Sequence, residues 1–272
     1  MPLLDKLREQ YGVGPLCSEL HIAPSTYYHC QQQRHHPDKR SARAQRDDWL
    51  KKEIQRVYDE NHKVYGVRKV WRQLLREGIR VARCTVARLM AVMGLAGVLR
   101  GKKVRTTISR KAVVAGDRVN RQFVAERPDQ LWVADSTYVS TWQGVVYVAF
   151  IIDVFAGYIV GWRVSSSMET TFVLDALEQA LWARRPSGTV HHSDKGSQYV
   201  SLAYTQRLKE AGLLASTGST GDSYDNAMAE SINGLYKAEV IHRKSWKNRA
   251  EVELATLTWV DWYNNRRLLE RL

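Results

Sequence analysis

The sequence predicts an α/β protein in which a mixed sheet flanked by helices follows an all-α region. Three observations lead to this prediction. Apolar residues recur at helical spacing through the first part of the chain. Positive charge replaces that periodicity over residues 99–127, and after Pro128 short alternating or apolar runs typical of strands begin. We therefore divide the chain into residues 1–45, 46–98, 99–127 and 128–272.

Residues 1 to about 32 are expected to be helical in three pieces. Within them, residues 13–28 have the pattern of a helix-turn-helix, in which one helix ends near Leu20 and the next opens at Pro24. Three side chains would lie on the exposed face of that second helix: Ser25, Thr26 and Tyr28. Residues 31–46 are polar and basic, and we interpret them as a linker.

Cysteine and histidine side chains near the start of the chain raise the question of a zinc site. Cys17 and His21 are four residues apart, which is a chelating spacing on a helix. No Cys-x-x-Cys pair accompanies them, so we favour ordinary helix packing. Cys17, Cys30 and Cys84 are odd in number and far apart, which argues against a disulfide framework.

The next segment predicts a second helix-turn-helix. Leu50 and Ile54 begin one helical stripe, a second helix ends at Gly78, and a third begins near Val81. Two basic side chains of the third helix would point outward: Arg83 and Arg88. A generic helical hairpin fits this pattern equally well by itself. Two such units followed by a basic stretch favour binding to DNA.

The basic stretch itself is predicted to be a connector that neutralises phosphates. Its cations are Arg100, Lys102, Lys103, Arg105, Arg110, Lys111, Arg118 and Arg121. The whole chain has a formal net charge of +13, from 41 Lys and Arg against 28 Asp and Glu, which favours a polyanionic partner. A solvated linker without a partner remains the alternative for this segment.

Features of export or membrane insertion are weak. The longest apolar run, Val145 to Ile152, is too short to span a bilayer, and the first residues lack the apolar stretch of a signal peptide. We therefore expect a cytoplasmic, nucleoid-associated protein without a membrane partner.

The remaining residues predict three hairpin-like strands and then alternating helices and strands. The strands are expected at 131–139, 145–154, 158–164, 190–193 and 213–216, and the helices at 169–184, 202–211, about 225–242 and 248–267. This order predicts a mixed sheet flanked by helices and fits a ribonuclease-H-like fold.

Three carboxylates in distinct contexts are the strongest functional signal. Asp135 is central in the first strand, Asp194 lies just past the carboxyl end of another strand, and Glu230 projects from a helix. Open α/β sheets bind ligands at such strand ends. Mg²⁺ prefers carboxylate and phosphate oxygens, and two ions about 4 Å apart can promote an in-line phosphoryl displacement. These residues are therefore candidate catalytic and metal-binding groups.

Polar neighbours extend this candidate site. Asn226, Glu230 and Lys237 are offset by four and seven residues and share one stripe of their helix, which suits phosphate and metal contact but also a plain solvated face. Gln198 belongs to a loop expected to pass close to a backbone or phosphate. Asp153 ends an apolar strand, and we expect it in a turn or cap instead. For His191 and His192 we favour structural hydrogen bonds over proton transfer.

Four motifs resemble bacterial insertion-sequence transposases of the IS-three family, specifically the second-reading-frame (orfB) product with its retroviral-integrase-like core. They are Trp132-Val-Ala-Asp-Ser-Thr-Tyr138, His192-Ser-Asp-Lys-Gly-Ser-Gln-Tyr199, Ser223-Tyr-Asp-Asn-Ala-Met-Ala-Glu-Ser231 and Trp262-Tyr-Asn-Asn-Arg-Arg267. Residues 64–72 and 81–86 are similar to the helix-turn-helix region of that family. The resemblance covers nearly the whole chain.

The resemblance implies a DNA transposase. Asp135, Asp194 and Glu230 would be the Asp-Asp-Glu triad that carries two Mg²⁺ ions, with Mn²⁺ as a substitute, and Lys237 would contact DNA near the cut. Members of the family cut one strand at an element end and use the freed 3′-hydroxyl to attack DNA. The DNA partners would be the terminal inverted repeats and the target.

The resemblance also implies further partners. Family members are generally fused to a first-frame segment and would assemble as homo-oligomers on DNA. Relatives usually continue beyond the last residues of this chain, so we expect a truncated carboxyl terminus. Two rival functions are a non-catalytic DNA-binding regulator and a simple ribonuclease-H-like nuclease. The complete set of three carboxylates argues against the regulator, and the helical modules argue against the nuclease.

Overall fold

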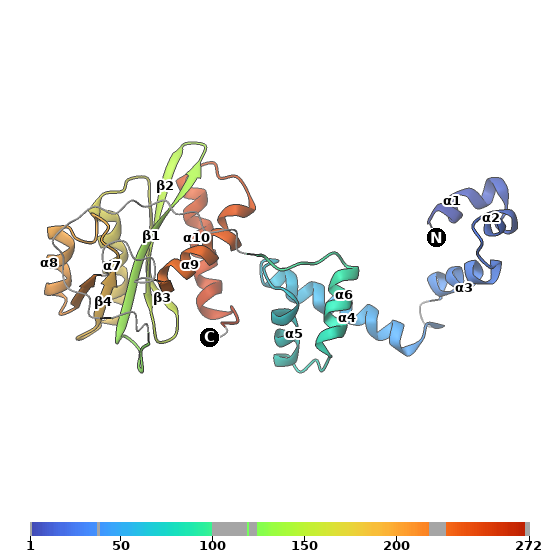
Figure 1. The fold of residues 1–272 in the computed structure, drawn as a ribbon, viewed down its shortest axis with the longest axis horizontal. Coiled ribbons are helices and arrows are strands. Elements are labelled where there is room, and N and C mark those ends of the chain that lie inside the picture. Colours follow the sequence, from blue (N-terminus) through green and yellow to red (C-terminus); the bar gives the residue numbers. More distant parts are fainter. Residues whose placement is uncertain (1, 37–38, 100–118, 120–123, 218–226, 270–272) are drawn as a thin grey trace. The chain divides into compact units, whose positions relative to one another are not determined.

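The computed structural model describes residues 2–36, 39–99, 119, 124–217 and 227–269 (Figure 1). The chain divides into two compact units, Met1–Gly97 and Val98–Leu272. Each unit is considered by itself. Among the described residues, no helix combines the length and the apolar character needed to cross a membrane.

The first unit is entirely helical in its described part. Its helices are α1 (Pro2–Tyr11), α2 (Val13–Glu19), α3 (Pro24–His35), α4 (Ala42–Glu60), α5 (Val67–Arg76) and α6 (Arg83–Val92). Leu4, Cys17 and Tyr27 form a small buried cluster that joins α1, α2 and α3. Cys17 is fully buried there, so it packs as an apolar side chain.

The first predicted helix-turn-helix has the expected helices, and Ser25, Thr26 and Tyr28 are exposed as predicted. The predicted linker over residues 31–46 is wrong at both ends. Helix α3 continues to His35 because Arg34 forms an ion pair with Asp5 of α1, 2.5 Å long. Helix α4 begins at Ala42, where the Ser41 hydroxyl caps it by accepting from Ala44 N. The predicted boundary at residue 45 therefore falls inside α4.

The second predicted helix-turn-helix corresponds to α4, α5 and α6. Leu50 and Ile54 of α4 are buried as their spacing predicts, and so are Val70 and Leu74 of α5. Gly78, with a φ of +83°, ends α5 in a conformation that favours glycine.

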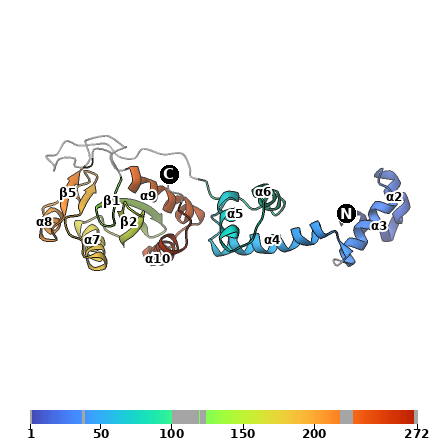
Figure 2. The same cartoon turned by 90° about the horizontal axis from the view of Figure 1, so that it is seen from below.

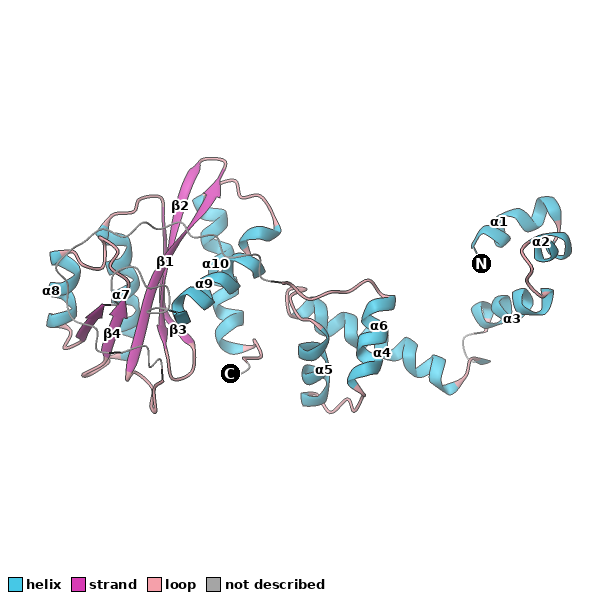
Figure 3. Ribbon diagram, viewed as in Figure 1, coloured by secondary structure: helices cyan, strands magenta, loops and turns pink. Residues whose placement is uncertain are grey.

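The second unit is a five-stranded sheet covered by helices on both faces (Figure 3). Its strands are β1 (Leu131–Thr141), β2 (Gly144–Asp153), β3 (Tyr158–Ser165), β4 (Val190–Ser193) and β5 (Leu214–Thr217), in the order β3-β2-β1-β4-β5. Its helices are α7 (Thr170–Arg184), α8 (Leu202–Glu210), α9 (Ala227–Glu239) and α10 (Arg249–Asn265), with a short 3₁₀ turn η2 (Ile241–Arg243) between the last two. The predicted mixed sheet flanked by helices is confirmed.

Strand pairing explains where the sheet leaves an opening. Strand β1 pairs antiparallel with β2 from Trp132 to Thr141 and parallel with β4 only from Leu131 to Ala134. Strand β4 ends at Ser193, so the longer β1 continues beyond it. The residues that follow the shared segment lie at the carboxyl end of β4.

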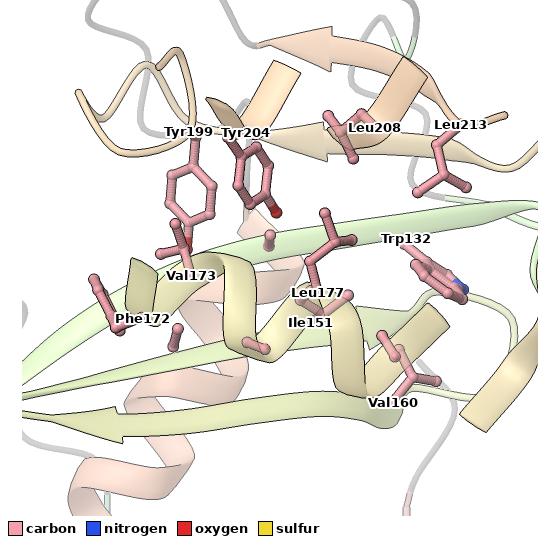
Figure 4. Close-up of a cluster of buried hydrophobic side chains, with 14 residues drawn as sticks. Trp132, Ile151, Val160, Phe172, Val173, Leu177, Tyr199, Tyr204, Leu208 and Leu213 are labelled. Carbon is pink, nitrogen blue, oxygen red and sulfur yellow. The ribbon is translucent and has the colours of Figure 1, made fainter. Parts of the chain in front are cut away.

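Each face of the sheet has its own apolar core. On one face, Trp132, Ala134 and Ile151 pack against α7 and α8 (Figure 4). On the other face, Phe150 of β2 packs edge-on against Tyr236 of α9, and its ring also contacts Trp259 of α10. Helices α9 and α10 therefore lie opposite α7 and α8, as Figures 1 and 2 show.

One glycine sets the distance between α7 and the sheet. A Cβ at Gly161 of β3 would lie 2.2 Å from the backbone oxygen of Ala176 in α7. Only a residue without a side chain permits this approach.

The predicted elements of this unit differ from the observed ones mainly at their ends. Helix α9 ends at Glu239 instead of about residue 242, because the chain then forms η2. The predicted start near Asp225 lies outside the described residues.

Candidate active site

Asp135 lies on β1, and Asp194 lies directly after β4, the parallel strand beside it. The last paired residues of β1 and β4 are Ala134 and Ser193, and the two aspartates follow them directly. Neighbouring strands lie about 4.8 Å apart, so the two residues meet at the carboxyl end of β4. The pairing thus joins side chains that are far apart in sequence.

Burial and neighbouring carboxylates raise the pKa values of both aspartates. Burial, the charge of Asp194 and the charge of Glu230 raise the pKa of Asp135 to about 7. Removal of water by the surrounding protein, and then the charge of Glu230, also raise the pKa of Asp194, although part of this residue is exposed. Negative charges held close together make it unfavourable for all of these carboxylates to be ionised at once. A bound cation would offset that effect.

Glu230 comes from a helix, α9, and not from the sheet that carries the two aspartates. It lies in the first turn of α9, where the helix dipole favours a negative charge. Helix α9 packs against β1, and its glutamate contributes to the pKa shifts of both aspartates. The structure therefore brings all three predicted carboxylates into mutual electrostatic range.

Asn233 is a member of the site that the sequence prediction missed. Its side-chain amide donates to Oδ2 of Asp135 over 2.9 Å, while the backbone N–H of Ser136 donates to Oδ1 over 2.8 Å. Asn233 lies three residues after Glu230, and helical spacing alone could have indicated it. Its own Oδ1 is buried and has no hydrogen-bond partner among the described residues. The buried Asn233 amide thus orients Asp135 through its nitrogen, while its oxygen accepts no hydrogen bond from the described residues.

Lys237 brings a cation to the same edge. Its ammonium lies 4.8 Å from the centre of the Tyr138 ring, in a cation–π contact. Burial lowers the pKa of Lys237, and the nearby charge of Asp135 opposes that shift. Glu230, Asn233 and Lys237 therefore form one polar face of α9 toward β1.

The loop after Asp194 is shaped by a glycine. The Gly196 N–H donates to Oδ1 of Asp194 over 3.0 Å, and a Cβ at Gly196 would lie 2.9 Å from that same oxygen. Gln198, predicted to contact DNA, is buried, and its amide donates to the backbone oxygen of Met168 over 3.2 Å. The side chain of Gln198 thus supports the loop, which its polarity alone did not reveal.

Nearby polar residues have structural roles, as predicted. Asp153 is fully buried, accepts from the backbone N–H groups of Phe155 and Asp129, and lies 3.7 Å from Arg184. His191 and His192 are both buried. The His191 ring is hydrogen-bonded to Tyr204, and the His192 ring is hydrogen-bonded to Ser216. Burial lowers the pKa of His191 to about 4, so this ring is neutral at neutral pH.

The other predicted DNA contacts fall into two groups. Arg83 is exposed at the first position of α6, whereas Arg88 donates to both carboxylate oxygens of Asp47 on α4, each over 2.8 Å. Three lie outside the described residues: Lys102, Lys103 and Asn226.

The donor set of the site fits divalent cations. Its carboxylate oxygens are ligands that Mg²⁺ prefers. Burial first, and neighbouring carboxylates second, raise the pKa values of Asp135 and Asp194, and a bound cation would favour their charged forms. Within the described part of the chain, no three His, Cys, Asp or Glu side chains converge on a single point. A pair of ions about 4 Å apart needs ligands spread over two points instead.

Models of known protein families match both units of the chain. Residues 125–223 and 211–268 each match a model of an integrase core domain, and residues 45–103 match a model of an HTH-like domain. Among solved structures, the HTLV-2 integrase catalytic core domain in complex with magnesium is similar, with a TM-score of 0.44 and 14% identity over 54% of this chain and 93% of that chain.

Curated relatives are much closer in sequence. The chain is 98% identical over 272 residues to the transposase for insertion sequence element IS629 of Shigella sonnei, covering 100% of this chain and 92% of the relative. It is 53% identical over 257 residues to the putative transposase for insertion sequence element IS986/IS6110 of Mycobacterium tuberculosis, covering 92% and 91% respectively. The chain therefore belongs to the insertion-sequence transposases of the IS-three family, the polynucleotidyl transferases of DNA transposition, with an HTH-like domain ahead of an integrase core.

Proposed function

We propose that Asp135, Asp194 and Glu230 are the catalytic triad with which this transposase cuts and joins DNA. The observation that carries the proposal is the placement of Asp135 and Asp194 directly after paired residues of adjacent parallel strands, with Glu230 of α9 in electrostatic contact with both. Among the described residues, Asp153 is a poor alternative, because its buried carboxylate accepts from two backbone N–H groups and lies beside Arg184.

The three carboxylates would hold two Mg²⁺ ions, for which Mn²⁺ could substitute. When bound, such ions activate the attacking oxygen and stabilise the leaving oxygen of an in-line displacement at phosphorus. The protein residues supply positioning and charge. Asn233 and the Ser136 N–H orient the two oxygens of Asp135, and Lys237 offers its ammonium to a phosphate.

Two successive transfers would use this one site. In the first, water attacks a phosphodiester at an element end, an oxygen–phosphorus bond forms, and the 3′-oxygen leaves as a free hydroxyl. In the second, that hydroxyl attacks another phosphodiester. Its oxygen forms a bond to the phosphorus, and the bond from that phosphorus to the 3′-oxygen of the attacked strand breaks. The outcome is copy-out and paste-in of the element.

The partner would be double-stranded DNA at the terminal inverted repeats and at the target. Support comes from the HTH-like domain match over residues 45–103, the net charge of +13 and the exposed Arg83 at the start of α6. Assembly into a homo-oligomer on the DNA and pairing with a first-frame segment belong to the same proposal.

A strand-transfer assay with oligonucleotides tests the triad. The wild type, supplied with Mg²⁺ or Mn²⁺ and the first-frame segment, is expected to join an element-end 3′-hydroxyl to target DNA. Asp135→Asn, Asp194→Asn and Glu230→Gln should each lose joining by at least about 100-fold while still binding the element end, because positioning and charge carry most of phosphoryl-transfer catalysis.

Asp175→Asn is the matched control. This carboxylate lies on α7 in an exposed ion pair with Arg163, so its loss should leave joining unchanged. Full joining by any of the three triad variants would refute the assignment. Binding without joining by the wild type would favour the DNA-binding regulator instead.

A further inference from the structure

Tyr138, the last residue of the first sequence motif, presents an aromatic ring at the surface. It lies on β1 three residues after Asp135, and 46% of it is exposed. Its partner across the hairpin, Tyr147 of β2, packs against Phe172 of α7, with ring centroids 6.3 Å apart. Helix α7 packs on β3 and β2, so it covers Tyr147 and leaves Tyr138 exposed (Figure 3). Exposed tyrosines are common, so the contacts of this ring decide what it can do.

A cation accompanies the ring. The Lys237 ammonium lies 4.8 Å from the centre of the Tyr138 ring. On α9, Lys237 lies about one turn after Asn233, the residue whose amide donates to Asp135. One face of α9 therefore contacts both the exposed ring and a proposed catalytic carboxylate, which places the ring at the border of the acidic site.

The ring and the acidic site meet around an open edge of β1. Tyr138 shares the α7 face of the sheet with Tyr147, whereas Asp135 faces α9. Strand β2 borders β1 on one side, and β4 borders it on the other side only as far as Ala134. Lys237 thus reaches the ring past the edge that β4 leaves open.

A DNA strand could follow the same edge. Asp135 and Tyr138 are separated by three residues of β1, which corresponds to about 10 Å along an extended strand. This distance equals the rise of about three nucleotides in one strand of B-form DNA. A nucleotide close to a phosphate held at Asp135 would therefore come within reach of the ring.

The hairpin that carries Tyr138 is supported at its tip. The backbone N–H of Trp142, in the turn, donates to the backbone oxygen of Trp246 over 3.0 Å, and Trp246 is buried. The Thr141 hydroxyl donates to the Gly144 oxygen over 2.7 Å and closes the turn. The exposed ring therefore lies on a strand with fixed neighbours.

We propose that Tyr138 is a stacking platform for one unpaired DNA base beside the cut, and that Lys237 binds the phosphate of that nucleotide. Aromatic rings beside cations bind single strands in this way, because every base has a π face and every phosphate a negative charge. A base within a duplex is covered on both faces, so the occupant is a base released from the element end. This inference rests on the proposed triad, because the triad places the cut at Asp135.

Photocrosslinking on the full chain tests the platform. Each probe is an element-end duplex with 5-iodouracil at one position within about three nucleotides of the cut. From one of these positions the base should crosslink to Tyr138, identified by peptide mass spectrometry. Tyr138→Leu keeps the apolar bulk without the π face, so it should lose the crosslink and lower strand transfer by about 5- to 100-fold. Tyr138→Phe keeps the π face and should retain both.

Trp182→Leu is the matched control. Trp182 is 82% exposed on α7, and its replacement should leave both the Tyr138 crosslink and strand transfer unchanged. Asp135→Asn should lose strand transfer and keep the crosslink, because it removes a catalytic group and not the ring.

The outcomes separate this inference from the triad. If no probe crosslinks to Tyr138, or if Tyr138→Leu transfers strands at the wild-type rate, the platform is wrong and the triad is untouched. Lost assembly of Tyr138→Leu copies on DNA, without a crosslink in the wild type, would assign the ring to a protein contact and would also overturn the platform. Full strand transfer by Asp135→Asn would refute the triad and this inference with it, since the cut would lie elsewhere.

Discussion

Asp135 combines two demands that oppose each other in a folded protein. It is partly buried and faces two other carboxylates, yet it must be ionised to act as a metal ligand. The hydrogen bonds from Asn233 and Ser136 favour the charged form and offset part of this conflict. A site of this kind stores unfavourable charge that a ligand can relieve.

This conflict predicts an unusual dependence of stability on pH. Because the folded-state pKa of Asp135 is raised to about 7, the folded protein binds more protons than the unfolded chain between roughly pH 4 and 7. The contribution of Asp135 to stability should therefore fall as pH rises through this range. In thermal unfolding without divalent ions, Asp135→Asn should gain stability over the wild type as pH increases from 5 to 8. A difference that does not change with pH would contradict the raised pKa.

Asn233 is expected to matter for activity more than for folding. Asn233→Ala removes the amide that orients Asp135 and should lower strand transfer by about 10- to 100-fold. Its effect on element-end binding should be small. Asn264→Ala is a useful contrast, because Asn264 pairs with both backbone groups of Ile159 and should affect stability instead. If Asn233→Ala lost strand transfer only in proportion to the fraction of protein that unfolds, the residue would be only structural.

At the scale of elements, α9 carries three site residues, and its far end is anchored to α10. Glu239, at the last position of α9, forms a buried ion pair of 2.5 Å with Arg267 and accepts from Nε1 of Trp259 over 3.0 Å. The sequence motif ending at Arg267 therefore acts through α9.

Breaking this anchor should unfold the core domain readily. Arg267→Ala leaves the Glu239 carboxylate buried without its cation and should cost about 3–5 kcal/mol in the free energy of unfolding, measured with urea. Arg249→Ala, at the start of α10, removes an exposed pair with Glu253, 3.9 Å long, and should cost less than about 1 kcal/mol. Similar costs for the two variants would contradict the anchoring role.

Elements with strong periodicity could be predicted, and some of their ends could not. The strands of the second unit follow from alternation and apolar runs, and β4 begins and ends at the predicted residues. Polar residues 31–35 were predicted to form a linker, because the contact between Arg34 and Asp5 that stabilises α3 is tertiary. Such contacts leave no local pattern.

The site shows the same division. Asp135, Asp194 and Glu230 could be named from their motifs, and their meeting point followed from strand order. Asn233 was missed although its spacing from Glu230 offered a signal, because its hydrogen bond to Asp135 depends on how α9 packs against β1. The role of Gln198 in supporting the loop was hidden because burial depends on the fold around it.

At the scale of the whole molecule, the charge of +13 acts on affinity for DNA. Binding to an element-end duplex should fall steeply with salt, because phosphate contacts release counterions. Arg83→Ala should weaken binding and reduce the slope of log affinity against log salt by about 1. Arg88→Ala should change the slope less, because Arg88 is paired with Asp47. Equal effects of the two substitutions, measured by fluorescence anisotropy, would argue against this distinction.

The two strands that carry the aspartates share only four paired positions before β4 stops. Side chains alternate between the faces of a strand, so one extra amino acid inserted between Leu131 and Ala134 would turn Asp135 toward α7. The register with β2, which pairs residues 132–141 of β1, would be disturbed as well. This stretch therefore tolerates exchange of one apolar side chain for another far better than any change in its length.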